Sequence, residues 1–355
     1  MIEAAPTVSL PEPLGRWAMG LLGAALPAET RATCHDCVMC LPEGLPHDPQ
    51  RIAFDPRIRC CTYRPHLPNF AVGAILAGGE AFAVESVRQR IAEGDASPLG
   101  LRVDAAYQLL YQHAKAASFG RARQLRCPHQ DENSQCGIWA NRPAVCATWY
   151  CKHERGGLGG RLWANLHSTL AAAERAVSLW CLRQLGFDSA AQRAAMDELN
   201  RDSVDAFTLD RQPNPALAHR LWGDWVGREE AFYTACAEQI RELHWPAVEQ
   251  LGPQELALLA AETRALASEH ADLNLPPRLR AGGFEVLGAV EGRLWLRSYS
   301  EFDTIEVAAE VMGLVARSDG RATEEIAAEH EACTGHRPPR VLLRMLLNFG
   351  ILVAA

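Results

Sequence analysis

Apolar residues recur at helical spacing through the middle of the chain. Between residues 161 and 185, Trp163, Leu166, Leu170 and Val177 repeat with a period of roughly 3.5 residues, which predicts one long amphipathic helix. Weaker patterns of the same kind predict helices over residues 14–26, 70–93, part of 103–125, 188–207, 215–243 and 254–270. The chain is therefore expected to be mainly α-helical.

The pattern changes after a proline-containing linker at residues 273–277. Two short apolar runs, 284–290 and 293–298, flank an acidic residue and a glycine and predict a β-hairpin. Helices are then expected over residues 304–316, from residue 323 and over 338–348, with a strand at 351–353. This order predicts a small α+β unit of winged-helix type over residues 281–355.

Two segments, residues 34–69 and 127–158, are rich in cysteine and proline and show no periodicity. We expect them to be loops held by something other than an apolar core. The glycines of residues 156–160 follow, and a flexible turn is the simpler interpretation, with an anion site at the next helix start as the alternative. The predicted organisation is an irregular cysteine-rich metal-binding domain over 1–158, a helical region packed on it over 159–275, and the unit over 281–355.

Composition and charge narrow the class of protein. The chain has 355 residues, of which 48% are hydrophobic and 22% charged, so it can fold a core. Its apolar runs are shorter than a membrane-spanning helix requires, so we expect no membrane partner. The net charge is −8 and no basic stripe is present, which disfavours a nucleic-acid partner. The sequence also lacks the common nucleotide-binding, zinc-protease and esterase motifs.

The cellular compartment decides whether clustered cysteines are read as disulfides or as metal ligands. The apolar stretch at residues 15–28 lacks the basic segment that precedes the core of a secretory signal peptide. We therefore expect a cytoplasmic protein. Thiols stay reduced there, so clustered cysteines point to metal binding rather than to disulfides.

The first cysteine group contains Cys34, Cys37 and Cys40, each separated by two residues. This spacing lets one tight turn aim two sulfurs at one centre, and both tetrahedral zinc and iron–sulfur clusters use it. Three such cysteines in succession are more typical of a cluster. Cys60 and Cys61 follow after nineteen residues, and since their side chains diverge they suit different corners of a cluster or two centres.

A second group contains Cys127, Cys136, Cys146 and Cys151, separated by eight, nine and four residues. Together the two groups give nine candidate ligands. Nine cysteines left free in loops would be costly and prone to oxidation, so metal binding is the favoured interpretation. The remaining three cysteines fall in or near predicted helices and are expected in the core: Cys181, Cys236 and Cys333.

These motifs resemble the cysteine-cluster family with a CxxCxxCC signature, whose members are described as zinc- or iron-chelating domains. The first part of the resemblance is Cys34–Cys40 with the following cysteine pair. The second part runs from Cys127 to Cys146, with Trp139 in the aromatic position and Arg142 and Pro143 in register. The resemblance covers residues 30–155.

One branch of that family, the flagellin lysine N-methylases, is understood to use an iron–sulfur cluster in methyl transfer. The resemblance therefore implies an iron–sulfur enzyme. Nine thiols allow two four-thiolate centres with one left over, or one cluster plus a zinc ion. We favour at least one [4Fe–4S] cluster over zinc alone, since ligand spacing by itself does not decide the metal.

Two neighbours of the thiols are candidate partners rather than ligands. His153 follows Cys151 by two residues and could ligate or hydrogen-bond a cluster sulfur, but a place outside the ligand set is favoured. Arg142 could donate to thiolates or to a substrate carboxylate, and a structural arginine that locks the loop is an equal alternative. No motif indicates catalytic residues.

Residues 284–353 resemble the PqqD-type peptide-recognition fold, mainly through residues 318–327 and 347–352. That resemblance implies a peptide or protein partner bound at a strand edge, with a plain packing or oligomerisation module as the alternative. Three functions follow. The first is an iron–sulfur enzyme that modifies a peptide, protein or small metabolite by methyl transfer or redox chemistry. The second is a zinc-stapled scaffold, metal chaperone or redox sensor. The third, a cluster-sensing transcriptional regulator, is disfavoured by the excess of acidic residues in this unit.

Overall fold

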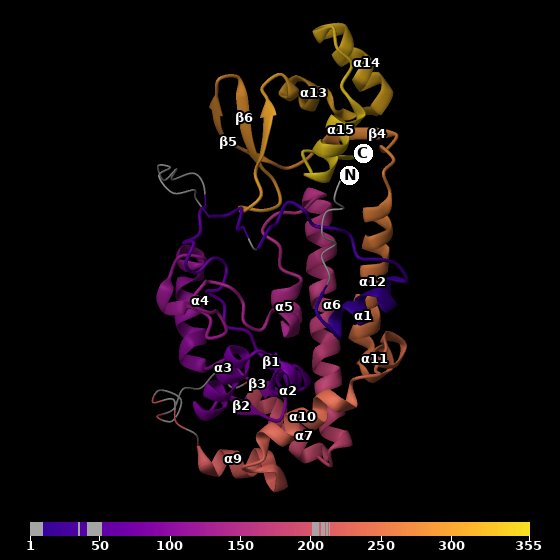
Figure 1. Ribbon diagram of the computed structural model, residues 1–355. Helices are drawn as coiled ribbons and strands as arrows, with labels where there is room; N and C mark the ends of the chain where they lie inside the picture. The colour runs from indigo at the N-terminus through magenta and orange to yellow at the C-terminus, as the bar shows by residue number, and fades with distance from the viewer. Residues whose placement is uncertain are drawn as a thin grey trace, which may run out of the picture.

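The computed structural model describes residues 10–34, 36–40, 52–200, 206, 210, 212 and 214–355. These residues are mostly helical, and three small three-stranded antiparallel sheets complete the described part (Figure 1). The prediction of a mainly α fold is confirmed. No helix among the described residues combines the length and the apolar character that crossing a bilayer requires.

The helices are α1 (Leu14–Leu22), α2 (Asn69–Gly78), α3 (Ala81–Ala92), α4 (Ala105–Ser118), α5 (Ala144–Ala147), α6 (Gly156–Gln184), α7 (Ser189–Leu199), α9 (Pro215–Trp222), α10 (Glu229–Gln239), α11 (Trp245–Leu251), α12 (Gln254–Ala271), α13 (Val311–Arg317), α14 (Thr323–Thr334) and α15 (Arg340–Asn348). The strands are β1 (Leu67–Pro68), β2 (Ala96–Ser97), β3 (Gly100–Leu101), β4 (Arg278–Ala281), β5 (Glu285–Val290), β6 (Arg293–Arg297), β7 (Ile305–Ala308), β8 (Asp319–Ala322) and β9 (Leu352–Ala354).

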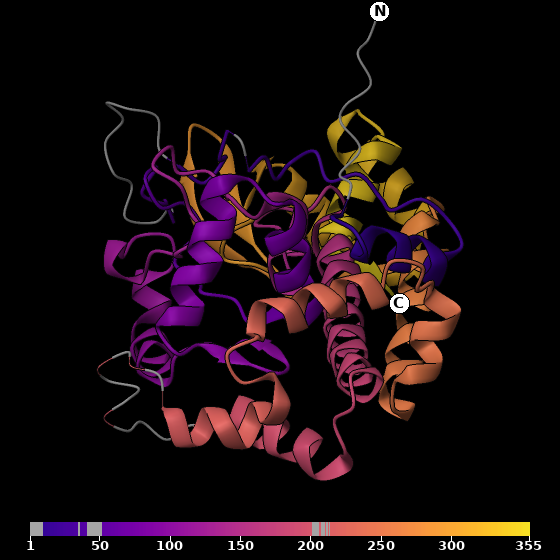
Figure 2. The same cartoon turned by 60° about the horizontal axis from the view of Figure 1, so that its bottom comes forward.

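Helix α6 is the axis around which the larger lobe is built. It lies between α3 and α4 on one side and α1, α11 and α12 on the other (Figures 1 and 2), and it contacts α2, α10, α11 and α12. The apolar positions that predicted this helix are buried, including Trp163, Leu166 and Leu170. They join Trp17 and Phe70 in the main apolar core. Burial of this one face explains why the sequence pattern located the helix correctly.

The glycines before the predicted helix belong to α6 itself, so the prediction of a flexible turn is wrong. The helix begins at Gly156, and its first turn packs tightly on the C-terminal unit. A Cβ atom at Gly160 would lie 3.0 Å from Cε2 of Tyr299, and one at Gly156 would lie 2.8 Å from the carbonyl oxygen of Asn348. The glycines therefore permit a close approach of two elements rather than a loose loop.

Two of the predicted helices are each broken in two. The pattern over residues 70–93 forms α2 and α3, with Gly79 between them. The pattern over 215–243 forms α9 and α10, separated by a stretch in which Gly223 and Gly227 adopt positive φ. Periodicity continues across such short interruptions, so it does not reveal them.

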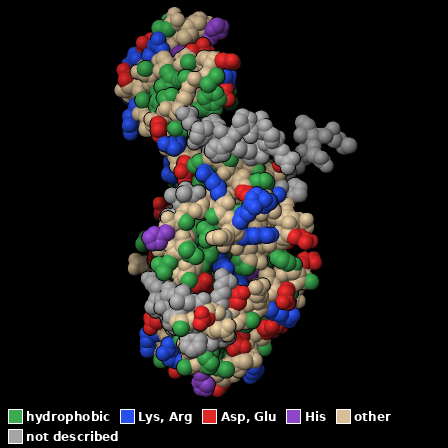
Figure 3. Space-filling view, turned by 90° about the vertical axis from the view of Figure 1, so that its left-hand side faces the viewer, with side chains coloured by type: hydrophobic (Ala, Val, Ile, Leu, Met, Phe, Trp, Pro, Cys, Tyr) green, Lys and Arg blue, Asp and Glu red, His purple; other side chains and the backbone are tan. Residues whose placement is uncertain are grey.

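Residues 279–352 enclose a second apolar core, which includes Leu279, Leu314, Leu346 and Leu352. This unit forms the upper lobe, separated from the larger lobe by a narrower region (Figure 3). The predicted hairpin is present as β5 and β6. Its turn residues Glu291 and Gly292 have φ angles of 49° and 78°, as a type I′ turn requires.

The predicted helix over 304–316 is wrong in its first half. Residues Ile305–Ala308 form strand β7, which pairs with β6, and only α13 is helical. Ile305 and Val307 are buried while Glu306 is exposed, which is the alternation of a strand at the surface of a core. Helices α14 and α15 and strand β9 lie close to the predicted positions.

Candidate metal centre

Eight of the nine predicted ligands line one cavity of about 320 Å³. They come from separate parts of the chain that lack regular structure or contain only the short helix α5. The eight residues are Cys34, Cys37, Cys60, Cys61, Cys127, Cys136, Cys146 and Cys151. All twelve cysteines of the chain are described and all are free thiols. The fold thus gathers thiols that lie up to 117 positions apart in sequence around one space.

Main-chain hydrogen bonds tie these loops to one another. The amide of Cys127 donates to the carbonyl oxygen of Cys61 over 2.7 Å, and the amide of Phe54 donates to the carbonyl oxygen of Met39 over 2.8 Å. The side-chain amide of Gln130 donates to the carbonyl oxygen of Ile58 over 3.0 Å. Backbone groups of one loop therefore form hydrogen bonds with another loop, and these bonds hold the thiols in place where long helices and strands are lacking.

The other cysteines lie outside this cavity. Cys40 does not line it, although its thiol lies within hydrogen-bonding range of the Cys37 thiol. Cys181 and Cys236 are fully buried in the main core, as predicted, and the Cys181 thiol lies 3.9 Å from the carbonyl oxygen of Cys236. Cys333 is exposed near the end of α14, so its assignment to the core is wrong. Its helix buries a different face, through Ile326, Ala327 and His330.

The arrangement of the thiols limits which metal centre they could hold. A single tetrahedral zinc ion holds its thiolates about 2.3 Å from the metal, so the sulfurs lie within about 4 Å of one another. Within the described residues, no three His, Cys, Asp or Glu side chains are arranged to hold a single ion. The eight thiols are instead spread around a larger cavity that no described carboxylate lines. Sulfur donors without carboxylates are compatible both with zinc and with an iron–sulfur cluster.

Arg142 brings positive charge to the thiols. Its guanidinium carbon lies 3.3 Å from the centre of the Trp139 ring, and Nη1 donates to the carbonyl oxygen of Cys146 over 3.4 Å. Both residues line the cavity. Burial raises the pKa of Cys34, Cys136 and Cys146, and the hydrogen bond with Cys61 together with burial raises that of Cys60. The charge of Arg142 partly opposes the rise at each of these four thiols. Both hydrogen bonds that Arg142 makes to the described residues go to backbone carbonyl oxygens, those of Trp139 and Cys146, which is the contact expected of an arginine that locks the loop.

Burial acts on the thiols in the opposite direction. It raises the pKa of Cys127 to about 11 and that of Cys151 to about 12. Burial, together with the neighbouring cysteines, also raises the pKa of Cys146 well above its usual value. The thiols of Cys127, Cys146 and Cys151 are therefore protonated at neutral pH unless a cation takes the place of the protons.

A buried polar network supports the second cysteine group. His129 lines the cavity, with Nδ1 2.8 Å from Oγ of Ser86 and Nε2 3.1 Å from Nη1 of Arg90. Arg90 is paired in turn with Asp95 over 2.9 Å. Because arginine donates only, Nε2 of His129 accepts and its proton resides on Nδ1. Both ring nitrogens are engaged, so His129 orients the loop rather than offering a free nitrogen.

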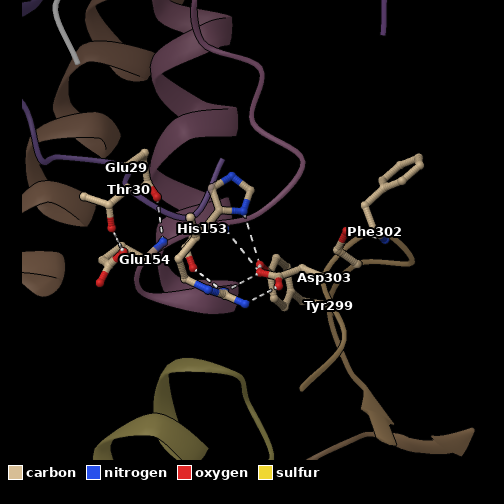
Figure 4. Close-up of polar contacts among 9 residues, drawn as sticks. Glu29, Thr30, His153, Glu154, Tyr299, Phe302 and Asp303 are labelled. Atoms are coloured by element: carbon tan, nitrogen blue, oxygen red, sulfur yellow. Dashed lines mark hydrogen bonds and ion pairs between the residues drawn. The ribbon is translucent and has the colours of Figure 1, made fainter. Parts of the chain in front are cut away.

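His153 does not line the cysteine cavity, although Cys151 is close in sequence. Its Nδ1 lies 3.2 Å from the hydroxyl oxygen of Tyr299. Figure 4 shows the ring turned toward Tyr299 and Asp303, which belong to the C-terminal unit. Burial lowers the pKa of His153 to about 4, so the ring is neutral. Its place is at the junction of the two lobes.

The C-terminal unit reaches the cysteine cavity through Phe302, a residue that the sequence analysis did not single out. The Phe302 ring packs edge-on against Phe54, Phe119 and Trp149, with centroid separations between 5.9 and 6.0 Å. Phe54, Phe119 and Trp149 line the cavity. The loop after β6 thus covers part of the cavity wall from the other lobe. A single phenylalanine in a short loop gives no sequence signal for this role.

No protein-family model, curated protein or solved structure matches the chain. The case for a function therefore depends on the cavity and the residues that surround it.

Proposed function

We propose that this chain is an iron–sulfur protein in which the cavity cysteines hold at least one [4Fe–4S] cluster. We propose further that it is an enzyme that modifies a peptide, protein or small metabolite. The observation that carries the proposal is the convergence of eight thiols, from distant parts of the chain, on one cavity. Cysteines that served only as small apolar residues would have no reason to share one space.

The size and chemistry of the cavity support a cluster. Its volume of about 320 Å³ is at the lower end of the range for cofactor sites. Its donors are soft sulfur atoms, and the nearby cations Arg59 and Arg142 oppose the negative charge of the thiolates. Eight thiols exceed the four that one cluster needs, so a second centre or a free thiol is compatible with this set.

The protein's own contribution to the chemistry is a shielded and positively biased surrounding. A bound cluster would supply Lewis acidity or electron transfer. Phe54, Phe119 and Trp149 form one side of the cavity, and Phe302 packs against all three of them. Arg142 is held in place by its stacking on Trp139, so its charge stays directed at the thiols. The charge of Arg142 opposes the rise in thiol pKa that burial causes, and the aromatic side chains cover one side of the cavity.

We propose that the C-terminal unit recognises a peptide or protein partner. Strand β5 pairs only with β6 among the described strands, so its outer edge offers free backbone groups. Val286 and Val290 on this strand are 48% and 56% exposed, and Figure 3 shows hydrophobic side chains gathered on this lobe. An extended peptide that pairs with β5 would cover these valines. The acidic balance of the unit opposes binding to DNA.

Anaerobic purification followed by iron, zinc and acid-labile sulfide analysis tests the cluster. We expect a coloured protein with broad visible absorption and with iron and sulfide in equal amounts. The absorption should bleach on reduction by dithionite. Retention on DNA at low and high salt serves as a separate test of the regulator alternative, and we expect none that depends on salt.

A colourless protein that contains zinc without sulfide would contradict the cluster and would favour a zinc-stapled scaffold. A protein with neither iron nor zinc after anaerobic purification would contradict metal binding altogether. Reconstitution with ferrous iron and sulfide separates loss during purification from inability to bind. A chain that does not take up iron under those conditions is not an iron–sulfur protein.

A further inference from the structure

A second cavity lies directly beside the cysteine cavity. It has a volume of about 280 Å³ and shares Tyr63 and Val145 with the first. Its polar wall comes from α6, with His167, Glu174, Arg175 and Ser178, and from His66 just before β1. None of these five residues lines the cysteine cavity. The fold therefore places a polar recess on the other side of one shared wall.

Three polar atoms in this recess have no hydrogen-bond partner in the described part of the chain. They are Nε2 of His66, Nδ1 of His167 and Oγ of Ser178. Ser178 is only 2% exposed, so bulk water does not satisfy its hydroxyl. A buried polar group without a partner costs about 1–3 kcal/mol. Three such atoms around one cavity indicate a binding site for a ligand that forms hydrogen bonds.

The only charged side chain among the polar residues that line the recess is that of Arg175. Burial lowers the pKa of His66 to about 4 and also lowers that of His167, so both rings are neutral at pH 7. Burial raises the pKa of Glu174 to about 8, so this carboxyl is largely protonated. Arg175 remains as the cation, and it forms no ion pair or side-chain hydrogen bond with the described part of the chain. The recess thus offers a positive charge and neutral hydrogen-bonding groups.

The rest of the lining is apolar. Leu99, Ala171, Met196 and Leu199 face the cavity together with two prolines. An apolar wall opposite a few converging polar groups is the usual arrangement of a small-molecule site. A ligand complementary to the polar wall and to the apolar wall has an anionic group attached to an apolar body.

We propose that this recess binds a small organic monocarboxylate with an apolar body. Arg175 pairs with the carboxylate, and Ser178 and His66 supply hydrogen bonds to it. The apolar body lies against Leu99 and Met196. Tyr63 and Val145 separate a ligand bound in the recess from the cysteine cavity. The inference is independent of the iron–sulfur proposal, since none of its residues is a proposed metal ligand.

Isothermal titration calorimetry on the full-length protein at pH 7 tests the site with benzoate and its neutral isostere benzamide. We expect benzoate to bind and benzamide to bind at least about tenfold more weakly, because the neutral amide forms no ion pair with Arg175. Arg175→Gln should weaken benzoate about tenfold or more. Arg183→Gln is the matched control, since Arg183 is exposed on the same helix and does not line the recess.

Ser178→Ala gives a second variant that keeps the proposal falsifiable if Arg175→Gln does not fold, and it should weaken benzoate several-fold. The proposal is overturned if benzoate does not bind, if benzamide binds equally well, or if both folded variants bind benzoate as the wild type does. Iron and sulfide are measured in the same samples. Absence of benzoate binding in a protein with full iron content is then a failure of this site alone.

Discussion

Arg31 and Asp303 form a bidentate ion pair between the two lobes. Nη1 and Nη2 of Arg31 donate to the two carboxylate oxygens of Asp303 over 2.9 and 2.7 Å. Asp303 is fully buried, and its carboxylate also accepts from the amide of His153 over 3.2 Å. Arg31 lies just before the first cysteine motif and Asp303 lies in the loop beside Phe302. The pair therefore joins the C-terminal unit to both cysteine groups.

Asp303→Ala should destabilise the protein by roughly 2–4 kcal/mol, because it leaves a partly buried guanidinium and the His153 amide without their acceptor. Urea denaturation measures the loss of unfolding free energy. Glu230→Ala is the control, since it breaks the exposed pair between Arg88 and Glu230 and should cost less than about 1 kcal/mol. Equal losses in the two variants would show that the pair between the lobes is not a stabilising contact.

Glu174 should make stability fall as the pH rises. Its folded pKa of about 8 lies above its unfolded value of 4.5, so its contribution is complete below pH 4.5 and is lost as the pH rises through 8. Between pH 6.5 and 8 the buried histidines with pKa near 4 are neutral in the folded state, and their own effect lies at lower pH. Burial also raises the pKa of Glu29 to about 7, so Glu29 titrates at the lower end of this window in the wild type and in the Glu174 variant alike. Over that window Glu174 should account for a loss of roughly 1–2 kcal/mol.

Glu174→Gln removes this titration while retaining an acceptor for the Ala144 amide, which donates to Glu174 over 2.8 Å. The variant should show a flatter stability profile between pH 6.5 and 8 and should be more stable than the wild type at pH 8. Glu262→Gln, on the exposed face of α12, makes the same charge change and should leave the profile as it is. A profile that Glu174→Gln does not alter would contradict the raised pKa.

Gly73 marks the closest approach of two helices in the main core. A Cβ atom there would lie 1.8 Å from the carbonyl oxygen of Tyr233, across the contact between α2 and α10. Gly73→Ala should therefore cost at least about 2–3 kcal/mol, since the backbone of one helix must move. Gly78→Ala is the matched control because nothing lies within 4 Å of its Cβ position. Thermal unfolding of both variants checks this, and a stable Gly73→Ala variant would show that the two helices separate without cost.

The sequence predicted those features that depend on local pattern. The buried face of α6 and the turn at Glu291 and Gly292 follow from periodicity and from residue types that tolerate positive φ. Features that depend on distant partners were missed. Gly156–Gly160 became helical because the chain packs there against Tyr299, which lies about 140 positions later. His153 lies outside the cysteine cavity because Asp303 and Tyr299 bind it.

The cysteine spacing predicted the ligand types but did not reveal how the two groups meet. Their convergence depends on cross-segment bonds such as that between Cys127 and Cys61, which spacing does not encode. The second cavity was missed as well, although α6 carried a signal. Glu174 lies on the helix face that Leu170 and Val177 bury, and a carboxyl on an apolar face marks a position that packing alone does not explain.

The most direct test of the metal centre compares Cys146→Ser with Cys333→Ser after anaerobic purification. Cys146 lines the cavity, whereas Cys333 is exposed and distant from it. We expect Cys333→Ser to keep the iron and sulfide of the wild type. Cys146→Ser should lose most of both and should melt at a lower temperature, because metal binding stabilises the surrounding loops. Equal iron and sulfide contents and equal melting temperatures in the two variants would contradict a cluster held by the cavity thiols.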